Sequence, residues 1–171
     1  VYLKKSTKTA STGSDDVRKT VLDILNKIEL GGDTVALKYA SQFDGYNGNL
    51  ILTNDEIQIA CDLVPEKLKR DIQFAHANVK RFAKAQLGTV TDFETEIVPG
   101  LIAGQKSIPC NAAGCYVPGG RYSHIASAIM TVTTAKVAGC QHITACSPPH
   151  KDTGIAPAII YAANLCGADK I

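Results

Sequence analysis

The chain has 171 residues, of which 45% are hydrophobic and 20% are charged. That length and composition suffice to bury one core or two small ones, and they predict a soluble globular protein. Eighteen lysines and arginines stand against sixteen aspartates and glutamates, a net charge of +2, with both signs interspersed along the chain. This balance excludes the strongly basic surface of a nucleic-acid-binding protein.

The sequence contains no sign of a membrane segment or of a secretory leader. No apolar run approaches the roughly 20 residues that a helix needs to cross a bilayer, and the start lacks the apolar region of a signal peptide. We therefore expect a cytoplasmic protein with no membrane partner. The six cysteines lie in apolar contexts without a C-x-x-C pair, which predicts small buried residues rather than disulfides or zinc ligands.

The two ends of the chain predict that it is the amino-terminal segment of a longer protein. It begins without methionine, and it ends at Ile171, where an apolar strand is just starting. We expect the isolated segment to lack part of its sheet.

The first part of the chain has the periodicity of helices. Ser14 suits the N-cap position, and apolar residues between Val17 and Ile28 share one face until Gly31 and Gly32 end the helix. A second, shorter helix is expected from Asp33 to Tyr39.

Two further helices are predicted after the Asp44-Gly45 turn. Thr53 and Glu56 have the spacing of a capping box at the start of one, and Pro65 suits the first turn of the other. An apolar stripe on the latter is predicted to be core: Leu68, Ile72, Ala75, Val79, Phe82 and Ala83. The bases on its other side could form a partner surface, but a solvated helix face is the simpler interpretation: Lys67, Lys69, Arg70, Lys80, Arg81 and Lys84.

The remaining sequence predicts short strands and then an alternating unit. Extended pieces are expected at residues 93–98, 101–103 and 107–109. After them come a strand at 115–117, a helix at 123–138, a strand at 142–146, a helix at 155–166 and the beginning of another strand.

This order of elements predicts the α/β fold class. We expect a helical amino-terminal region followed by an incomplete Rossmann-like parallel β-α-β-α unit. The expected domains are residues 1–112, helical with short strands, and residues 113–171, with the boundary near residues 110–114.

The strongest local feature is the segment Tyr116-Val-Pro-Gly-Gly120, at the carboxyl end of a predicted strand and just before a helix. Ligands bind at this place in open α/β sheets, and free N–H groups at a helix start favour phosphate. Adjacent glycines allow close approach of a ligand, and Tyr116 offers a flat ring and a hydroxyl. The segment is not G-x-G-x-x-G, and no acidic residue follows at ribose-binding spacing. By itself it is either a structural tight turn or a cofactor site.

The four histidines give no metal-ligand pattern, since none pairs with another histidine or a cysteine at a suitable spacing. Each is interpreted as a surface or satisfied histidine, although His124 falls in the first turn of the helix beside the glycine loop. No nucleophile and base can be paired from the residues present. The four are His76, His124, His142 and His150.

The order of several segments resembles the central signature of histidinol dehydrogenases. The matching segments are Tyr116-Val-Pro-Gly-Gly120, Ala135-Lys-Val-Ala-Gly139, Ser147-Pro-Pro149 and Tyr161-Ala-Ala-Asn-Leu-Cys-Gly167. The amino-terminal half also resembles that family at Gly32-Asp33, Ala36-Leu37, Phe43-Asp44 and Pro99-Gly100. The resemblance covers essentially the whole chain.

The resemblance implies a homodimeric, zinc-dependent enzyme that oxidises a primary alcohol to a carboxylate by two hydride transfers to NAD through an aldehyde. In the family the tyrosine that matches Tyr116 contacts NAD, which favours an NAD site at Tyr116, Pro118, Gly119 and Gly120. The family's catalytic Glu-His pair and zinc ligands lie in segments beyond Ile171. We therefore expect no catalytic or metal-binding residue here and no activity of the isolated segment. The alternative is a non-catalytic dinucleotide-binding or dimerisation segment.

The residues after the two glycines depart from most histidinol dehydrogenases. Arg121 to Ser127 and Thr133-Thr134 resemble instead the branch of sulfopropanediol 3-dehydrogenases, which act on 2,3-dihydroxypropane-1-sulfonate. The implied substrate is therefore L-histidinol or that sulfonate. Arg121 is either a cation beside an anionic substrate or pyrophosphate, or an exposed arginine without a role.

Overall fold

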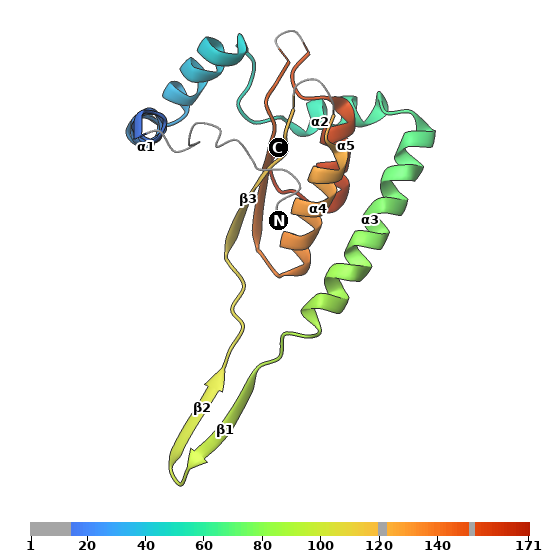
Figure 1. Cartoon of the computed structure of the whole chain (residues 1–171). Coiled ribbons are helices and arrows are strands. Elements are labelled where there is room, and N and C mark those ends of the chain that lie inside the picture. Colours follow the sequence, from blue (N-terminus) through green and yellow to red (C-terminus); the bar gives the residue numbers. More distant parts are fainter. Residues whose placement is uncertain (1–14, 120–122, 151–152) are drawn as a thin grey trace, which may run out of the picture. The chain divides into compact units, whose positions relative to one another are not determined.

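The computed structural model of the chain describes residues 15–119, 123–150 and 153–171. Helices come first along the sequence, short strands follow, and helices then alternate with a strand, as can be followed in Figure 1. Two compact units divide the chain, one ending at Asn47 and the other starting at Gly48. The domain boundary expected near residues 110–114 stays a prediction.

The first unit consists of α1 (Asp15–Asp44), which is two helices joined at Gly32. Gly32 has φ 58° and ψ −148°, a conformation that glycine reaches without the steric cost of a Cβ. The predicted end of the first helix at the two glycines is confirmed. In the second helix the rings of Tyr39 and Phe43 stack with their centroids 5.4 Å apart.

The second unit begins with α2 (Asn54–Asp62) and α3 (Glu66–Leu87). The predicted capping box is present: the Glu56 N–H donates to Thr53 Oγ1 at 3.2 Å, and the Thr53 N–H donates to Glu56 Oε2 at 2.7 Å. Pro65 is the N-cap of α3, one position before the helix itself. Both starts lie where the sequence predicted them.

The apolar stripe of α3 is only partly core. Ile72 and Ala83 are buried, and Leu68, Ala75 and Val79 pack against the core while remaining partly exposed. Phe82 is 66% exposed, so its assignment to the core was wrong. Successive residues of a helix are turned by about 100°, and the position of Ala83 against the core therefore directs its neighbour Phe82 away from it.

An antiparallel hairpin follows α3. β1 (Phe93–Val98) pairs with β2 (Leu101–Gln105) across a turn in which Gly100 has φ 85°. In Figure 1 the hairpin extends away from α3 and the other helices of its unit, and both of its faces are exposed. The strand predicted at residues 107–109 is absent, because the Ser107 N–H donates to Asp92 Oδ1 at 2.8 Å instead of to a neighbouring strand.

The predicted β-α-β-α unit is confirmed. β3 (Ala112–Tyr116), α4 (Ile125–Val137), β4 (His142–Cys146) and α5 (Pro157–Cys166) follow one another, and β3 pairs with β4 in parallel. The register runs from Ala112 opposite His142 to Tyr116 opposite Cys146. A parallel bridge between Thr144 and Lys170 places the beginning of a third strand on the other side of β4.

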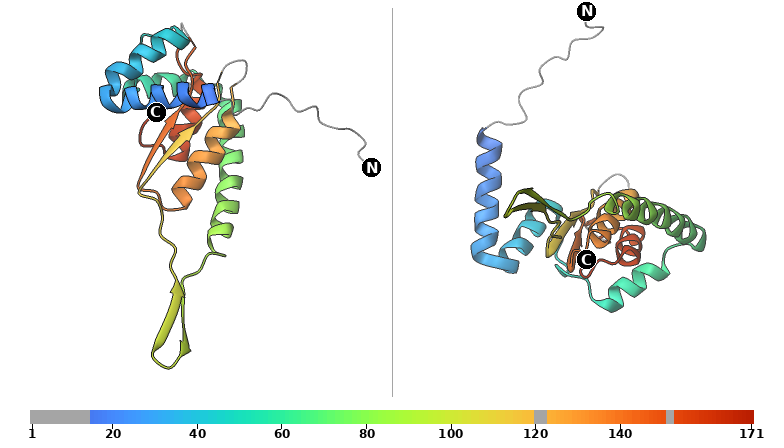
Figure 2. Two further views of the ribbon diagram at one scale, coloured as in Figure 1. Left: turned by 60° about the vertical axis from the view of Figure 1, so that its left-hand side comes forward. Right: turned by 90° about the horizontal axis from the view of Figure 1, so that it is seen from below.

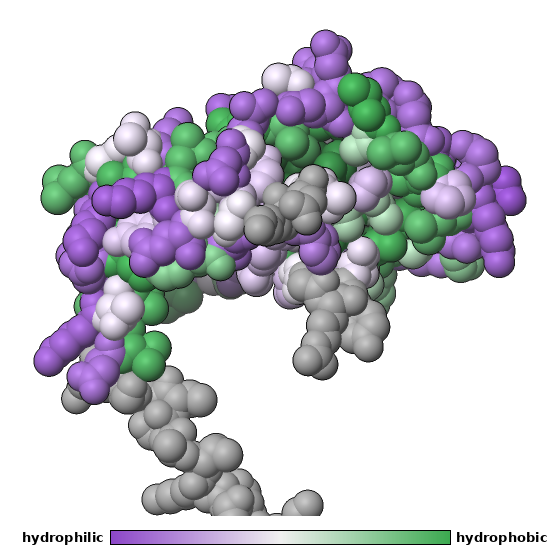
Figure 3. All heavy atoms as spheres, turned by 90° about the horizontal axis from the view of Figure 1, so that it is seen from above, coloured by the Kyte–Doolittle hydropathy of each residue, from purple (hydrophilic) through white to green (hydrophobic). Residues whose placement is uncertain are grey.

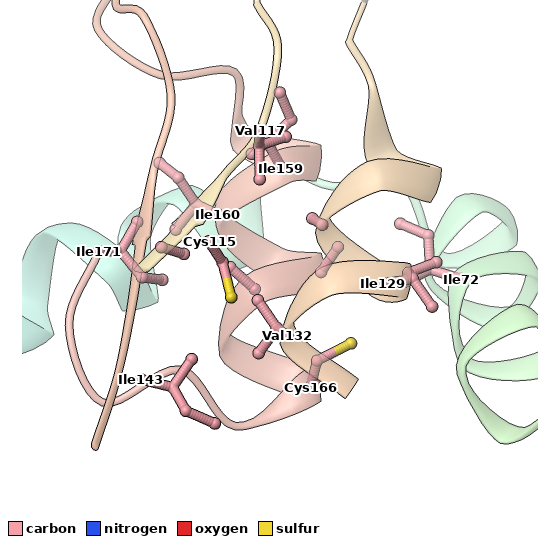
Figure 4. Close-up of a cluster of buried hydrophobic side chains, with 14 of the residues drawn as sticks. Ile72, Cys115, Val117, Ile129, Val132, Ile143, Ile159, Ile160, Cys166 and Ile171 are labelled. Carbon is pink, nitrogen blue, oxygen red and sulfur yellow. The ribbon is translucent and has the colours of Figure 1, made fainter. Parts of the chain in front are cut away.

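The core of the second unit lies between the strands and the helices. Figure 4 shows Ile143 of β4, Val132 of α4 and Ile160 of α5 in one buried cluster. The views of Figure 2 show α4 and α5 beside the parallel strands, with α3 packed outside α4. α4 is thus enclosed on several sides, which explains why it is apolar nearly all round.

The cysteines are all free thiols, but they are not uniformly buried. Cys61, Cys115 and Cys166 are buried, whereas Cys110 and Cys146 are exposed, which corrects the expectation of six buried residues. Cys146 is exposed because it stands opposite Tyr116 on the face of the strand pair away from the core. In the described part of the chain, no helix is long and apolar enough to span a membrane.

Candidate functional site

The candidate site is the end of β3 and the loop that follows it. Tyr116 is the last residue of β3 and is 60% exposed, whereas its neighbours Cys115 and Val117 are buried. Successive residues of a strand point to opposite faces, so the Tyr116 side chain leaves the sheet on the face away from Cys115 and Val117. The Val117 N–H donates to the Cys146 carbonyl at 2.7 Å and holds the loop to β4.

Gly119 brings the loop after β3 against the loop after β4. A Cβ at Gly119 would lie 2.9 Å from the Pro148 carbonyl oxygen and 3.2 Å from Ser147 Oγ. The first distance is too short for any side chain, so glycine is required at this position for the packing of the two loops. A structural reason for one of the two glycines therefore exists alongside the ligand-binding interpretation.

Ser147 supplies an unused polar group at the same place. Its Oγ is buried and has no hydrogen-bond partner among the described residues, although it follows directly after β4. A buried hydroxyl without a partner costs about 1 to 3 kcal/mol, unless a ligand or water supplies the missing bond. The carboxyl ends of the parallel strands thus combine an exposed aromatic ring, an unpaired hydroxyl and a closely packed glycine, which suits a nucleotide cofactor.

Figure 3 shows the molecule from the side at which β3 and β4 end. Among the coloured residues in this view, hydrophobic and hydrophilic side chains are interleaved.

Three of the residues singled out in the sequence lie outside the described part of the chain: Ser14, Gly120 and Arg121. Pro118 is half-buried between the strand and the glycine. His124 is the N-cap residue of α4 and is exposed, and its side chain makes no capping hydrogen bond. The assignment of Tyr116, Pro118, Gly119 and Gly120 to NAD stays a prediction.

The described residues contain no group of three or more His, Cys, Asp or Glu that could hold a metal ion. Zinc therefore does not fit any arrangement of side chains in this part of the molecule.

The sequence matches the family model of histidinol dehydrogenase over residues 7–171. The chain belongs to the histidinol dehydrogenase family. The resemblance found in the ordered segments from Tyr116 to Gly167 is thereby confirmed, together with the mixed α/β fold class.

Individual members of the histidinol dehydrogenase family differ in their similarity to the chain. The chain is 65% identical over 170 residues to the sulfopropanediol 3-dehydrogenase of Ruegeria pomeroyi. This alignment covers 99% of the chain and 39% of that protein. The chain is 36% identical over 161 residues to the histidinol dehydrogenase of Methanosarcina barkeri, covering 94% of the chain and 37% of that protein. The chain thus spans less than half the length of these relatives.

A solved structure of the histidinol dehydrogenase family has the same fold. The histidinol dehydrogenase of Elizabethkingia anophelis superposes with a TM-score of 0.82 at 30% identity, over 93% of this chain and 36% of that one. The fold is therefore that of the family. Sequence reasoning noted Ser147-Pro-Pro149 only as part of the family signature, because an unpaired hydroxyl has no sequence signal of its own.

Proposed function

We propose that the chain is part of an NAD-dependent dehydrogenase that oxidises 2,3-dihydroxypropane-1-sulfonate to the carboxylate, through an aldehyde and in two hydride transfers. The observation that supports this most strongly is the 65% identity to a sulfopropanediol 3-dehydrogenase, against 36% to a histidinol dehydrogenase over a similar length. The departure from histidinol dehydrogenases after Gly120 supports the same choice of substrate.

In the proposed site the carboxyl ends of β3 and β4 would hold NAD, which would supply the acceptor for the hydride when bound. The exposed ring of Tyr116 would pack against the cofactor, and Gly119 would offer its backbone N–H to it, since Pro118 has none to donate. The Ser147 hydroxyl would donate the hydrogen bond that it lacks in the free protein.

The proposal extends to a homodimer in the cytoplasm and to a zinc ion bound outside the described residues, as the family resemblance implies. No step of the reaction is assigned to a metal, since the described residues offer no metal site. The groups that move protons are likewise expected outside this chain.

The experiment is a side-by-side kinetic comparison in the complete protein. We expect kcat/KM to be higher for 2,3-dihydroxypropane-1-sulfonate than for L-histidinol, with two NADH formed for each alcohol consumed. A preference for histidinol would overturn the proposed substrate but leave the reaction type intact. One NADH per alcohol, with release of the aldehyde, would overturn the two-step reaction.

A further inference from the structure

A cavity lies between α3, α4 and α5, at the end of α4 away from the Tyr116 loop. Its volume is about 270 Å³, and it is lined in part by His76, Lys80 and Lys84 of α3 and by Lys136 of α4. Lys136 stands in the last turn of α4, whereas the Tyr116 loop precedes the first turn. The 13 residues of α4 separate the two places by roughly 20 Å.

The positive charge of this cavity has little compensation. α3 carries no acidic residue after Asp71, and α4 and α5 carry none at all. Asp169 lies 3.9 Å from Lys136 as an ion pair, but among the described residues Lys80 and Lys84 form no ion pair. Within the described part of the chain, Lys136 is thus the only one of the three lysines with a carboxylate at ion-pair distance.

Helix stability does not explain the arrangement of the bases. His76, Lys80 and Lys84 follow one another at intervals of four residues on one face of α3, where like charges repel. A helix dipole favours a cation in the last turn, which accounts for Lys84 and Lys136. It does not account for Lys80, which lies about two turns before the end of α3, where the dipole effect has decayed.

A buried hydroxyl without a strong hydrogen-bond partner also lines the cavity. Thr133 is only 1% exposed, and among the described residues its Oγ1 has no oxygen or nitrogen hydrogen-bond partner. The buried thiol of Cys166 interacts with this hydroxyl, but sulfur forms only weak hydrogen bonds. A hydroxyl donor that lines the same cavity as three lysines matches the needs of an oxyanion, which accepts hydrogen bonds and carries negative charge.

We propose that this cavity binds a small tetrahedral oxyanion of the phosphate or sulfate class, held by Lys80, Lys84 and Lys136 and by the Thr133 hydroxyl. A dinucleotide is too large for this cavity of about 270 Å³. Even drug-sized ligands, which are smaller than a dinucleotide, occupy cavities of about 300 to 1,000 Å³. The site is therefore distinct from the candidate cofactor site, and it does not depend on the proposed function.

The test is isothermal titration calorimetry of the protein with inorganic phosphate and with sulfate. We expect saturable one-to-one binding with a dissociation constant of about 1 mM. Lys80→Gln should weaken phosphate binding about tenfold, and Thr133→Val, which keeps the shape of the side chain, about threefold or more. Arg81→Gln is the matched control, because it removes one charge from the adjacent position of α3, which does not line the cavity, and should change the affinity less than twofold.

The His76 imidazole provides a second readout that does not depend on calorimetry. Its pKa is lowered by burial and by the charge of Lys80. A bound anion beside Lys80 would oppose that charge, so saturating phosphate should raise the pKa of His76 in an NMR titration.

Three results would overturn the proposal. The first is an effect of Arg81→Gln as large as that of Lys80→Gln, which would mean general surface attraction. The second is unchanged phosphate binding in a folded Thr133→Val protein. The third is tighter binding of acetate than of phosphate, which would assign the cavity to a carboxylate instead of a tetrahedral oxyanion.

Discussion

Asp169 and Ile143 are joined by two hydrogen bonds that run in opposite directions. The Ile143 N–H donates to Asp169 Oδ2 at 2.7 Å, and the Asp169 N–H donates to the Ile143 carbonyl at 2.7 Å. This pair aligns the segment after α5 with β4. The carbonyl of Lys170, the residue after Asp169, then accepts a hydrogen bond from the Ala145 N–H at 2.9 Å. The Asp169 carboxylate and two backbone hydrogen bonds thus position the start of the third parallel strand.

Replacement of Asp169 by alanine should destabilise the second unit. The Ile143 N–H belongs to a fully buried residue and would lose its acceptor, which costs about 1 to 3 kcal/mol of unfolding free energy. Asp169→Asn keeps an acceptor oxygen and should lose much less. Urea denaturation of the two variants gives the difference. Equal losses would instead place the effect in the charge of Asp169, although its exposed pair with Lys136 is expected to contribute little.

The capping box at the start of α2 should make stability depend on pH. The pKa of Glu56 is lowered, first by the hydrogen bond from the Thr53 N–H and then by the Thr53 hydroxyl. A lowered folded pKa means that Glu56 stabilises the fold above its unfolded pKa of about 4.3, and that this contribution disappears as the pH falls through the folded pKa.

The measurement compares wild type with Glu56→Gln in urea between pH 7 and about pH 3. We expect the variant to be less stable at pH 7 and the two proteins to converge at the acid end. Asp55→Asn is the control, since Asp55 is a neighbouring acid in the same first turn outside the capping box. A difference between wild type and Glu56→Gln that persists unchanged in acid would contradict the role of the carboxylate.

Two glycines of the β3 region should respond differently to alanine. A Cβ at Gly119 meets the Pro148 carbonyl at 2.9 Å, whereas a Cβ at Gly114 meets nothing within 4 Å. Gly119→Ala should therefore lower the unfolding free energy by about 1 to 3 kcal/mol, as overpacking does, and Gly114→Ala should change it by less than about 0.5 kcal/mol. Thermal unfolding of both variants decides, and an unaffected Gly119→Ala protein would show that the two loops are not packed together.

Tyr116 should contribute to NAD binding in the complete protein. Tyr116→Ala is expected to weaken the binding by about 1 to 3 kcal/mol, the range for losing a packed ring and one hydrogen bond. Tyr116→Phe keeps the ring and should lose only the part due to the hydroxyl. Fluorescence titration with NADH measures both. Since Tyr116 is exposed, the variants should fold, and an unchanged affinity of Tyr116→Ala would return the loop to a purely structural role.

The 171-residue chain by itself should neither hold stoichiometric zinc nor form NADH. A catalytic zinc needs about three converging protein ligands, and the described residues contain no such group. Elemental analysis of the purified chain and an assay with both alcohols provide the measurement. Bound zinc at one equivalent, or turnover of either alcohol, would show that the active site lies within this segment.

The sequence alone determined the elements whose cause is local. The capping box of Thr53 and Glu56 and the helix break at Gly32 depend on residues within one turn of each other, so their patterns are legible without a fold. The same holds for the left-handed Gly167 after α5 and for the strand at residues 142–146, which the apolar pattern bounded correctly. The ordered motifs from Tyr116 to Gly167 were also sufficient to identify the family.

Only the tertiary structure decided what depends on residues distant in sequence. Helical spacing placed Phe82 in the stripe, but the packing of α3 on α4 left it exposed. The approach of Gly119 to Pro148 and the meeting of Lys80 and Lys84 with Thr133 at one cavity join segments about 30 to 55 residues apart. No local pattern encodes such contacts, because they arise when packed elements bring unrelated segments together.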